Sequence, residues 1–343
     1  MLEKRATIRD VATLAGVSIS TVSRVLRDEN SVREERRIRV KKAIKELDFT
    51  PNVAAQQMHG QKECTIGAIT TRSSYQAFGN PYFPSVIGAI GSVTEERGYN
   101  LQIHSYSDSM SEIRKTVRLF KSGQVNGFIL LSSRVYDPLI VELMKNKIPF
   151  TLVGRVIENT IPDYDDIYWV NNDNIASSKG AVEYLIHKGH ERIGILTAPD
   201  KYVVSQDRYT GYRQALVANG KEYHSRYRAE AGYSYEDAKQ AAELLVRNNP
   251  DMTAIFATDD LKGVAAIEKL TEMGIRIPEQ IAVMGCDNFE ISKIIRPSLT
   301  TINIPIHSLG VAAATMLIDL LEGREVEERH VIFETEMILR EST

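Results

Sequence analysis

The chain has 343 residues, of which 43% are apolar and 25% charged, and its formal net charge is −3. This length exceeds one typical core and predicts two or three domains, and the composition is that of an ordinary folded protein. No run of about eighteen apolar residues is present and the first ten residues lack an apolar signal segment, so we expect neither a membrane partner nor secretion.

The cysteines and the charge distribution indicate the cellular compartment and the kind of partner. Cys64 and Cys286 lie far apart and form no metal-ligand spacing, which fits thiols in a reducing cytoplasm. Residues 1–62 carry thirteen Lys and Arg against eight Asp and Glu, a net charge of +5, whereas the remainder has a net charge of −8. A basic N-terminal segment (residues 1–62, the basic head) on an acidic remainder predicts that this segment binds a polyanion.

The basic head reads as three short helices. Residues 7–15 have apolar side chains at helical spacing, Gly16 suits a tight turn, and residues 18–26 form a second amphipathic segment. A third helix follows, with apolar residues at i, i+3, i+4 and i+7 from Val40 to Leu47. Two helices joined by a glycine turn and followed by a third predict a helix-turn-helix unit.

The second segment carries short hydroxyls and an arginine on its polar face. Ser and Thr donate to phosphates without holding a helix away from DNA, and Arg reaches guanine edges. DNA binding is therefore favoured over the alternative, a small helical bundle with a serine-rich solvent face.

The segment TIRDVATLAGVSISTVSRVL, with the third helix and FTPN, resembles the headpiece of the lactose/galactose-repressor family of bacterial transcription regulators. The residues for which this resemblance implies DNA contact are Ser18, Ile19, Ser20, Thr21, Ser23 and Arg24. Ile19, Ser20 and Arg24 would face base edges, and the others would hold phosphates. Arg33 stands where the family usually has a capping Ser, so we expect Ser31 to cap the third helix or the helix start to fray.

The next stretch, TPNVAAQQMHGQK at residues 50–62, reads from its residues alone as a linker, because Pro51 and Gly60 bracket too few turns for a stable helix. In the family, the matching segment becomes a helix on operator DNA in a dimer and inserts an apolar side chain into the minor groove. The resemblance gives Met58 that inserting role, in place of the usual Leu, and implies DNA and hinge contacts for Asn52 and Ala55.

From about residue 62 the chain alternates apolar strands with helices in two successive runs. This pattern predicts parallel sheets covered by helices, in two similar α/β lobes. Polar residues follow the predicted strands, at the edge where ligands bind in such folds. The candidate ligand-binding residues are Arg155, Asn172, Asp173, Arg208, Tyr233, Asp260 and Asp287.

These residue types suit a sugar, since planar charged groups hold neighbouring hydroxyls and an aromatic face packs against the ring. Asp173 and Asp260 each precede an apolar helix, so helix capping is their alternative reading. No phosphate-binding glycine motif, catalytic triad or metal-ligand spacing is present in the sequence. We therefore expect no enzyme activity, no cofactor and no metal.

The resemblance extends over GHERIGIL, DRYTGYRQAL, AIFATDD, VMGCDN and PSLTTINIP, and so over nearly the whole chain. It implies a core like the periplasmic sugar-binding proteins, with Arg208 and Asp287 on effector hydroxyls and Tyr233 stacked on a ring. Asp259 stands where the family more often has Asn. NPYFPSV, FTLVGR, VNNDN and VSQDRYTGY look most like maltose-operon repressors of Gram-positive bacteria.

The predicted organisation is an all-α headpiece (1–50), a hinge segment (51–61) and an effector-binding core (62–343). Lobe one is expected at 62–165 plus 296–325, and lobe two at 166–295 plus 326–343. PSLTTINIP would return to the first lobe and HVIFETEMIL to the second. We see no leucine heptads near Thr343, which favours a dimer over a tetramer.

The sequence therefore predicts a cytoplasmic, homodimeric repressor of a carbohydrate operon. It would bind double-stranded palindromic operator DNA and respond to a sugar, with maltose or a related α-glucoside as the first choice. The alternatives are a purine- or phosphoprotein-responsive regulator of the same family and, less favoured, a solute-binding protein.

Replacing Met58 tests the hinge reading. Met58→Ala should weaken operator binding and reduce DNA bending, because alanine is too short to separate base steps. Gel-shift titration and a bending assay would measure both effects. If neither quantity changes, residues 50–62 serve only as a linker.

Overall fold

The computed structural model describes residues 6–26, 32–47, 49, 64–106, 108–158, 160–161 and 163–343. It divides into two compact units, Met1–Glu63 and Cys64–Thr343, which are treated separately below. The hinge candidates Asn52, Ala55 and Met58 lie outside the described residues. Within the described ranges, no helix combines the length and apolarity that a bilayer crossing requires.

The first unit contains α1 (Ile8–Ala15), α2 (Ile19–Leu26) and α3 (Glu34–Glu46). α1 starts with a reciprocal capping box between Thr7 and Asp10 and ends at Gly16, whose φ of 63° is left-handed. One side chain from each helix is completely buried in a shared core: Val11, Val22 and Val40. Helices this short depend on such packing, because eight residues are marginal alone.

The predicted cap of α3 is only partly tested. Arg33 occupies the N-cap position and makes no side-chain capping bond. Ser31, the expected alternative cap, is outside the described part of the chain. Two acidic residues, Glu34 and Glu35, lie in the first turn, where negative charge favours the helix dipole.

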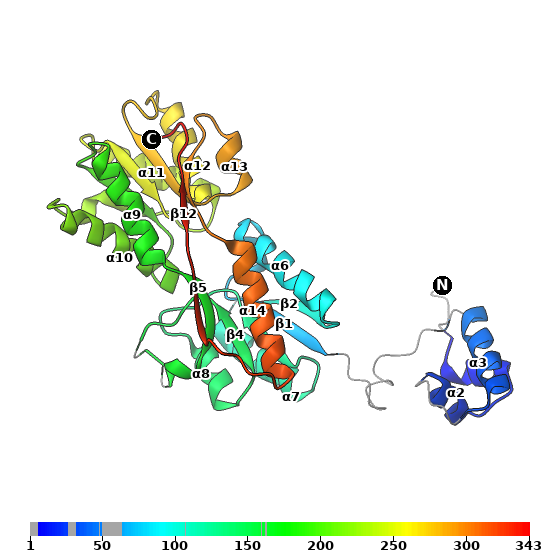
Figure 1. The fold of residues 1–343 in the computed structure, drawn as a ribbon. Coiled ribbons are helices and arrows are strands. Elements are labelled where there is room, and N and C mark those ends of the chain that lie inside the picture. The colour runs from blue at the N-terminus through cyan, green and yellow to red at the C-terminus, as the bar shows by residue number, and fades with distance from the viewer. Residues whose placement is uncertain are drawn as a thin grey trace. The chain divides into compact units, whose positions relative to one another are not determined.

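The second unit contains two six-stranded sheets, one in each lobe (Figure 1). The first has the order β11 (His330–Phe333), β5 (Tyr168–Asn172), β4 (Phe150–Val153), β3 (Gly127–Leu130), β1 (Thr65–Thr70), β2 (Asn100–Ser105), all parallel. The second has the order β12 (Glu336–Ile338), β10 (Thr300–Asn303), β9 (Ala282–Asp287), β8 (Ala254–Ala257), β6 (Ile193–Thr197), β7 (Arg228–Glu230). Only the β10–β12 pairing in this sheet is antiparallel.

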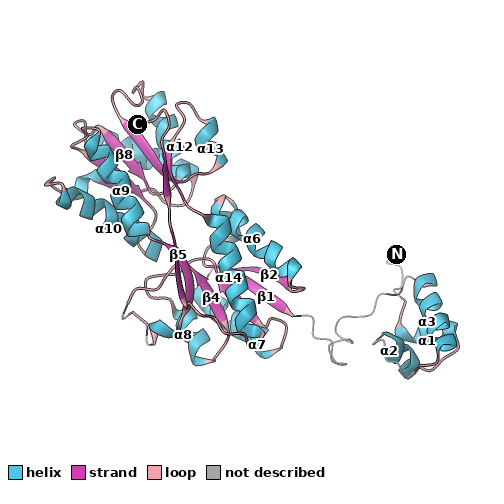
Figure 2. Cartoon of the chain, viewed as in Figure 1, coloured by secondary structure: helices cyan, strands magenta, loops and turns pink. Residues whose placement is uncertain are grey.

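Helices accompany both sheets (Figure 2). Those of the first lobe are α5 (Ser74–Phe78), α6 (Tyr82–Glu96), α7 (Ser109–Lys121), α8 (Pro138–Lys145) and α14 (Ile306–Leu321), with the 3-10 turn Tyr164–Asp166. Those of the second are α9 (Asn174–His187), α10 (Val203–Ala218), α11 (Tyr235–Asn248), α12 (Asp260–Glu272) and α13 (Glu290–Ile294), with the 3-10 turn Ser225–Tyr227. The central strands are buried along their whole length, as parallel sheets covered on both faces require. The predicted fold class is confirmed.

The expected lobe boundaries are wrong in three places. β5 and β11 pair in the first sheet, not the second, and β10 pairs in the second sheet, not the first. The chain therefore crosses between lobes from β5 to α9, from β10 to α14, and from β11 to β12. The cause of the error is physical: β5 and β10 are each followed by a helix, as most strands of both lobes are, so alternation along the chain cannot reveal the sheet in which a strand pairs.

The close approach of α9 and α10 gives a stability prediction. A Cβ at Gly211 would lie 2.3 Å from the Ile175 carbonyl oxygen and 2.9 Å from the Lys179 nitrogen, both backbone atoms. Gly211→Ala should therefore lower the free energy of unfolding by about 1–3 kcal/mol, through overpacking.

Gly180→Ala is the matched control on α9. A Cβ there meets no described atom within 4 Å, so it should raise stability by up to about 1 kcal/mol through helix propensity. Urea unfolding of both variants measures the difference. Equal stabilities would contradict the close packing.

Candidate functional site

The exposed face of α2 holds the predicted DNA-contacting side chains. Val22 and Val25 are buried in the headpiece core, whereas Ile19 is 43% exposed and Arg24 is also exposed. Ser20 is exposed as well, and Ser23 is half-buried beside this face. The structure thus leaves the predicted face available to a partner, and the contacts themselves stay a prediction.

Hydroxyl groups cluster at the start of α2. The Oγ of Ser18 accepts a hydrogen bond from the Thr21 backbone nitrogen at 3.2 Å, which caps the helix. It also lies 2.8 Å from the Ser20 hydroxyl and 2.9 Å from the Thr21 hydroxyl. A helix N-terminus with clustered hydroxyl donors is suited to a DNA phosphate.

The core contains a cavity of about 100 Å³ between its lobes, at the carboxyl ends of both sets of parallel strands. The first lobe lines it with Arg72, Asn80, Tyr82, Phe83, Leu131, Ser132, Ser133, Val153, Gly154, Arg155, Asn171 and Asn172. The second lobe and its connection add Asn174, Ala198, Val203, Val204, Ser205, Asp207, Arg208, Thr258, Asp259, Asp287 and Ile304. At roughly 10–15 Å³ per water site, this space holds about seven to ten waters.

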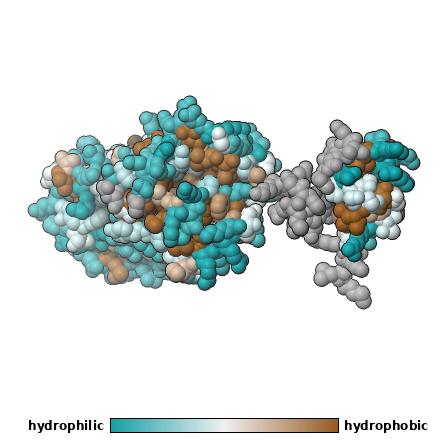
Figure 3. Space-filling model, turned by 90° about the horizontal axis from the view of Figure 1, so that it is seen from below, coloured by the Kyte–Doolittle hydropathy of each residue, from teal (hydrophilic) through white to brown (hydrophobic). Residues whose placement is uncertain are grey.

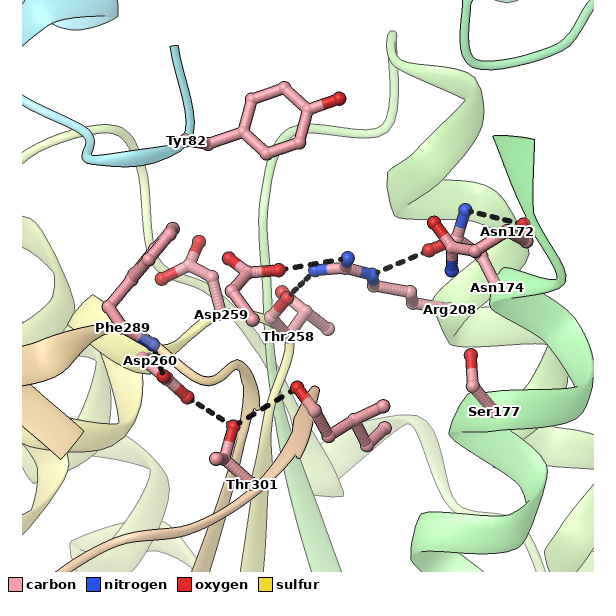
Figure 4. Close-up of polar contacts among 12 residues, drawn as sticks. Tyr82, Asn172, Asn174, Ser177, Arg208, Thr258, Asp259, Asp260, Phe289 and Thr301 are labelled. Atoms are coloured by element: carbon pink, nitrogen blue, oxygen red, sulfur yellow. Dashed lines mark hydrogen bonds and ion pairs between the residues drawn. The ribbon is translucent and has the colours of Figure 1, made fainter. Parts of the chain in front are cut away.

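Arg208 is at the centre of the polar contacts in this cavity (Figure 4). The residue is 8% exposed, and its side chain donates from Nε to Asn174 Oδ1 at 3.0 Å, from Nη1 to the Thr258 carbonyl, and from Nη2 to Asp287 Oδ1 at 3.1 Å. Burial alone would lower the pKa of Arg208, but surrounding groups that include Asp287 raise it, so the guanidinium stays charged. Its orientation is fixed by three different segments.

Asp287 ends β9 in a strained backbone conformation. Its φ is 116° and that of Asn288 is 60°, values that favour glycine. Burial raises the pKa of the Asp287 carboxyl from its ordinary value of 3.8 to about 6, although Arg208 opposes the shift. Burial also raises the pKa of the Tyr82 phenol, with a further contribution from Asp287. Figure 4 shows Tyr82 reaching over the Arg208–Asp259 region.

The prediction for Asp260, as a cavity residue or as the cap of the following helix, is wrong in both forms, and its neighbour Asp259 takes both positions. Asp259 lines the cavity, caps α12 by accepting from the Lys262 nitrogen at 2.9 Å, and pairs with the Lys262 ammonium. Burial would raise the pKa of Asp259, but Lys262 lowers it overall. Asp260 does not line the cavity; it accepts from the Phe289 nitrogen at 2.7 Å and from the Thr301 hydroxyl at 2.5 Å.

Two other candidates also lie outside the cavity wall. Asp173 is exposed and caps α9, accepting from the Ala176 nitrogen at 2.8 Å, which is its alternative reading. Tyr233 packs edge-on to Tyr202, with ring centroids 6.3 Å apart. Of the seven predicted residues, the cavity brings together Arg155, Asn172, Arg208 and Asp287.

The sequence reading missed several polar residues of the cavity. Asp207 accepts from Arg155 at 2.9 Å and 2.5 Å, a two-pronged bond that joins the lobes. Asn174 lies in the first turn of α9, so a search of strand ends overlooks it. Arg72 follows β1 just as Arg155 follows β4, so its position after a strand was the sequence signal for it.

These features define a helix-turn-helix regulator whose core has a ligand cavity between two lobes. Residues 7–52 match the bacterial regulatory proteins, lacI family, and residues 182–343 match the periplasmic binding protein-like domain. The chain is 32% identical to the HTH-type transcriptional regulator CelR of Thermobifida fusca, over 99% of this chain and 98% of that protein. A solved CelR–cellobiose complex has 31% identity, a TM-score of 0.77, and coverage of 99% of this chain and 100% of that one.

Two further relatives agree with this placement. The HTH-type transcriptional repressor PurR of Aliivibrio fischeri is 29% identical over 98% of both chains. The lac repressor dimer bound to operator and an anti-inducer has 26% identity, a TM-score of 0.83, and coverage of 99% of each chain. This protein belongs to the lacI family of bacterial regulatory proteins: it is a DNA-binding transcriptional regulator and not an enzyme.

The raised pKa of Asp287 predicts a pH dependence of stability. Between about pH 4 and 6 the folded state binds more protons than the unfolded state, so this group's stabilising contribution is lost as pH rises through about 6. Relative to Asp287→Asn, the wild type should lose up to about 3 kcal/mol of unfolding free energy between pH 4 and 7. Urea unfolding over this range gives the difference.

Asp259→Asn is the control with the opposite sign. The pKa of Asp259 is lowered, so its stabilising contribution is present at neutral pH and is lost as pH falls. A flat difference curve for Asp287, or one that runs parallel to that for Asp259, would contradict the assignment.

Proposed function

We propose that this protein represses a carbohydrate-utilisation operon by binding a palindromic operator as a homodimer, and that a glucose-containing disaccharide in the cavity between the lobes sets its operator affinity. The observation that carries the proposal is the convergence of Arg208 and Asp287 on a cavity lined by both lobes. A carboxylate beside a guanidinium offers acceptor and donor side by side, the pattern that two neighbouring sugar hydroxyls match.

The choice of sugar combines two sources of support. The sequence pattern favoured maltose or a related α-glucoside, whereas a solved relative at 31% identity is a complex with cellobiose. Both are glucose disaccharides with a similar set of hydroxyls. The aromatic rings of Tyr82 and Phe83 in the cavity wall supply the apolar surface that the face of a sugar ring needs.

The route from cavity to DNA follows from the contacts between lobes. Arg155 of the first lobe bonds Asp207 of the second, so a ligand that disturbs this pair changes the balance between lobe arrangements. In our proposal the change reaches the operator through residues 51–61. By linkage, operator DNA must alter sugar affinity by the same factor.

Dimerisation completes the proposal. A two-fold protein matches a palindromic site, and the lac repressor relative is a dimer on its operator. Apolar areas are visible on the face of the core in Figure 3. Two exposed apolar side chains are Ile103 on β2, which is 45% exposed, and Met110 on α7, which is 75% exposed. In our proposal a second subunit covers apolar surface of this kind. Sedimentation of the purified protein measures its oligomeric state.

A purine is the second candidate ligand. PurR is 29% identical to this chain, and a base could lie against Tyr82 with its edge on Asp287. Operator-binding anisotropy with maltose, cellobiose, galactosides and purines separates the two candidates. A disaccharide that changes operator affinity supports the proposal. The proposal is contradicted if purines alone change operator affinity, or if none of the compounds changes it.

Arg24 provides the test of DNA reading. If its guanidinium reads a base, Arg24→Ala should cost about 1–3 kcal/mol on the operator and less on random DNA. Arg24→Lys is the matched control, because it retains the charge without the planar fork and should keep non-specific binding while losing specificity. Equal losses on both DNAs for Arg24→Ala would make Arg24 a phosphate contact.

A further inference from the structure

The two guanidinium groups that join the cavity's polar network are neutralised within it. Arg208 bonds Asp287, and Arg155 bonds Asp207. Arg72 lines the same cavity but forms no ion pair with any carboxylate in the described part of the chain. At one end of the cavity, therefore, the described residues leave the positive charge of Arg72 without a paired carboxylate.

Three aromatic rings lie close to the Arg72 guanidinium. Its central carbon lies 5.0 Å from the ring centroid of Phe83 in the first lobe. It lies 4.8 Å from that of Tyr202 and 5.7 Å from that of Tyr233, both in the second lobe. Ring faces attract a cation but accept no strong N–H bond. The Nε of Arg72 is buried without a hydrogen-bond partner among the described atoms, so a directed donor is left unused.

A second cation shares two of these rings. The ammonium nitrogen of Lys201 lies 5.4 Å from the Tyr202 centroid and 5.6 Å from the Tyr233 centroid. Glu230 is close enough to contribute to the raised pKa of Tyr233, but forms no ion pair with Arg72 or Lys201 within the described residues. The described residues supply neither cation with an ion-pair partner, so the two positive charges beside the same rings repel each other. An anion between the lobes would relieve that repulsion.

We propose that the effector is an anionic saccharide, a sugar phosphate or a sugar acid, whose anionic oxygens bind Arg72 while its hydroxyls bind Arg208 and Asp287. This inference rests on the proposed function and deepens it by naming the class of sugar. A neutral hydroxyl would accept one bond from Arg72 but leave its charge unbalanced. Phosphate and carboxylate oxygens match the planar guanidinium fork and neutralise the charge.

The arrangement also assigns Arg72 a specificity role distinct from that of Arg208. Arg72 leaves the end of β1 in the first lobe, while the rings of Tyr202 and Tyr233 come from the second. An anion on Arg72 therefore lies where the two lobes meet, so its charge acts directly on the contact between them. Discrimination by charge would take place at this end, and hydroxyl recognition at the other.

Titration calorimetry on the full-length protein tests the inference. The ligands are maltose and cellobiose, their 6′-phosphates, the disaccharides ending in glucuronic acid, and inorganic phosphate alone. We expect at least one charged disaccharide to bind ten-fold or more tightly than its neutral parent, with an advantage that shrinks as salt rises. The phosphate and carboxylate arms distinguish the two sources of anion.

Variants assign the advantage to Arg72. Arg72→Gln should reduce the affinity advantage of the charged over the neutral disaccharide to less than three-fold, while the affinity for neutral sugars changes little. Arg72→Lys should retain part of this advantage. Arg324→Gln removes an exposed arginine of the first lobe, paired with Asp319 and away from the cavity, and should retain all of it. Thermal unfolding and ligand-free operator binding confirm that each variant is folded.

The outcomes separate this inference from the proposed function. If neutral disaccharides bind as tightly as charged ones, the anionic class is wrong and the sugar-responsive function stands. An equal weakening of neutral and charged sugars by Arg72→Gln would likewise overturn it, because Arg72 would then contact ring hydroxyls. If no saccharide binds, both proposals are wrong. Binding of inorganic phosphate alone as tight as that of any sugar phosphate also overturns the saccharide class.

Discussion

The guanidinium of Arg208 holds together the parts of the second lobe that face the ligand cavity. Its three acceptors come from the start of α9, the end of β8 and the end of β9. Burying a charge in this way is costly unless every donor finds a partner, so each acceptor must stay in place. The strained backbone of Asp287 is consistent with this demand, because such strain persists only where the surrounding structure fixes the residue. The cavity's shape follows from these bonds.

The sequence allowed the fold class, the headpiece and the central residues of the cavity to be predicted, for identifiable reasons. Hydrophobic periodicity located the helices, and parallel strands must align their carboxyl ends, which indicated Asp287. Arg208 lies within α10, and its role was implied by the family resemblance. The pairing of β5, β10 and β11 could not be read in this way, since the choice between two sheets depends on packing far along the chain. Contacts such as Arg155–Asp207 are invisible for the same reason: both residues are polar, and only the folded lobes bring them together.

The two neighbouring acids after β8 show a second limit of prediction from the sequence, at the level of a single residue. A pattern of strand, two acids and apolar helix fits either acid as the cap, and a shift of one residue turns a side chain from the cavity into the protein interior. Asp259 caps α12 and faces the cavity, while Asp260 faces away from it toward Thr301. Burial raises the pKa of Asp260 well above its usual value, whereas its bonds to the Phe289 nitrogen and the Thr301 hydroxyl hold it in a structural role. Its neighbour keeps its charge beside Lys262.

The three crossings between the lobes restrict how the core can move. A single connection would let one lobe rotate in any direction relative to the other. Three connections that run side by side must all move together, so they restrict the lobes mainly to a rotation about one hinge axis (Figure 1). A ligand therefore has few ways to rearrange the core, and different ligands are distinguished by the angle that they stabilise along the same path. The same redundancy implies that a protease cut in any one crossing would leave the two lobes joined by the other two.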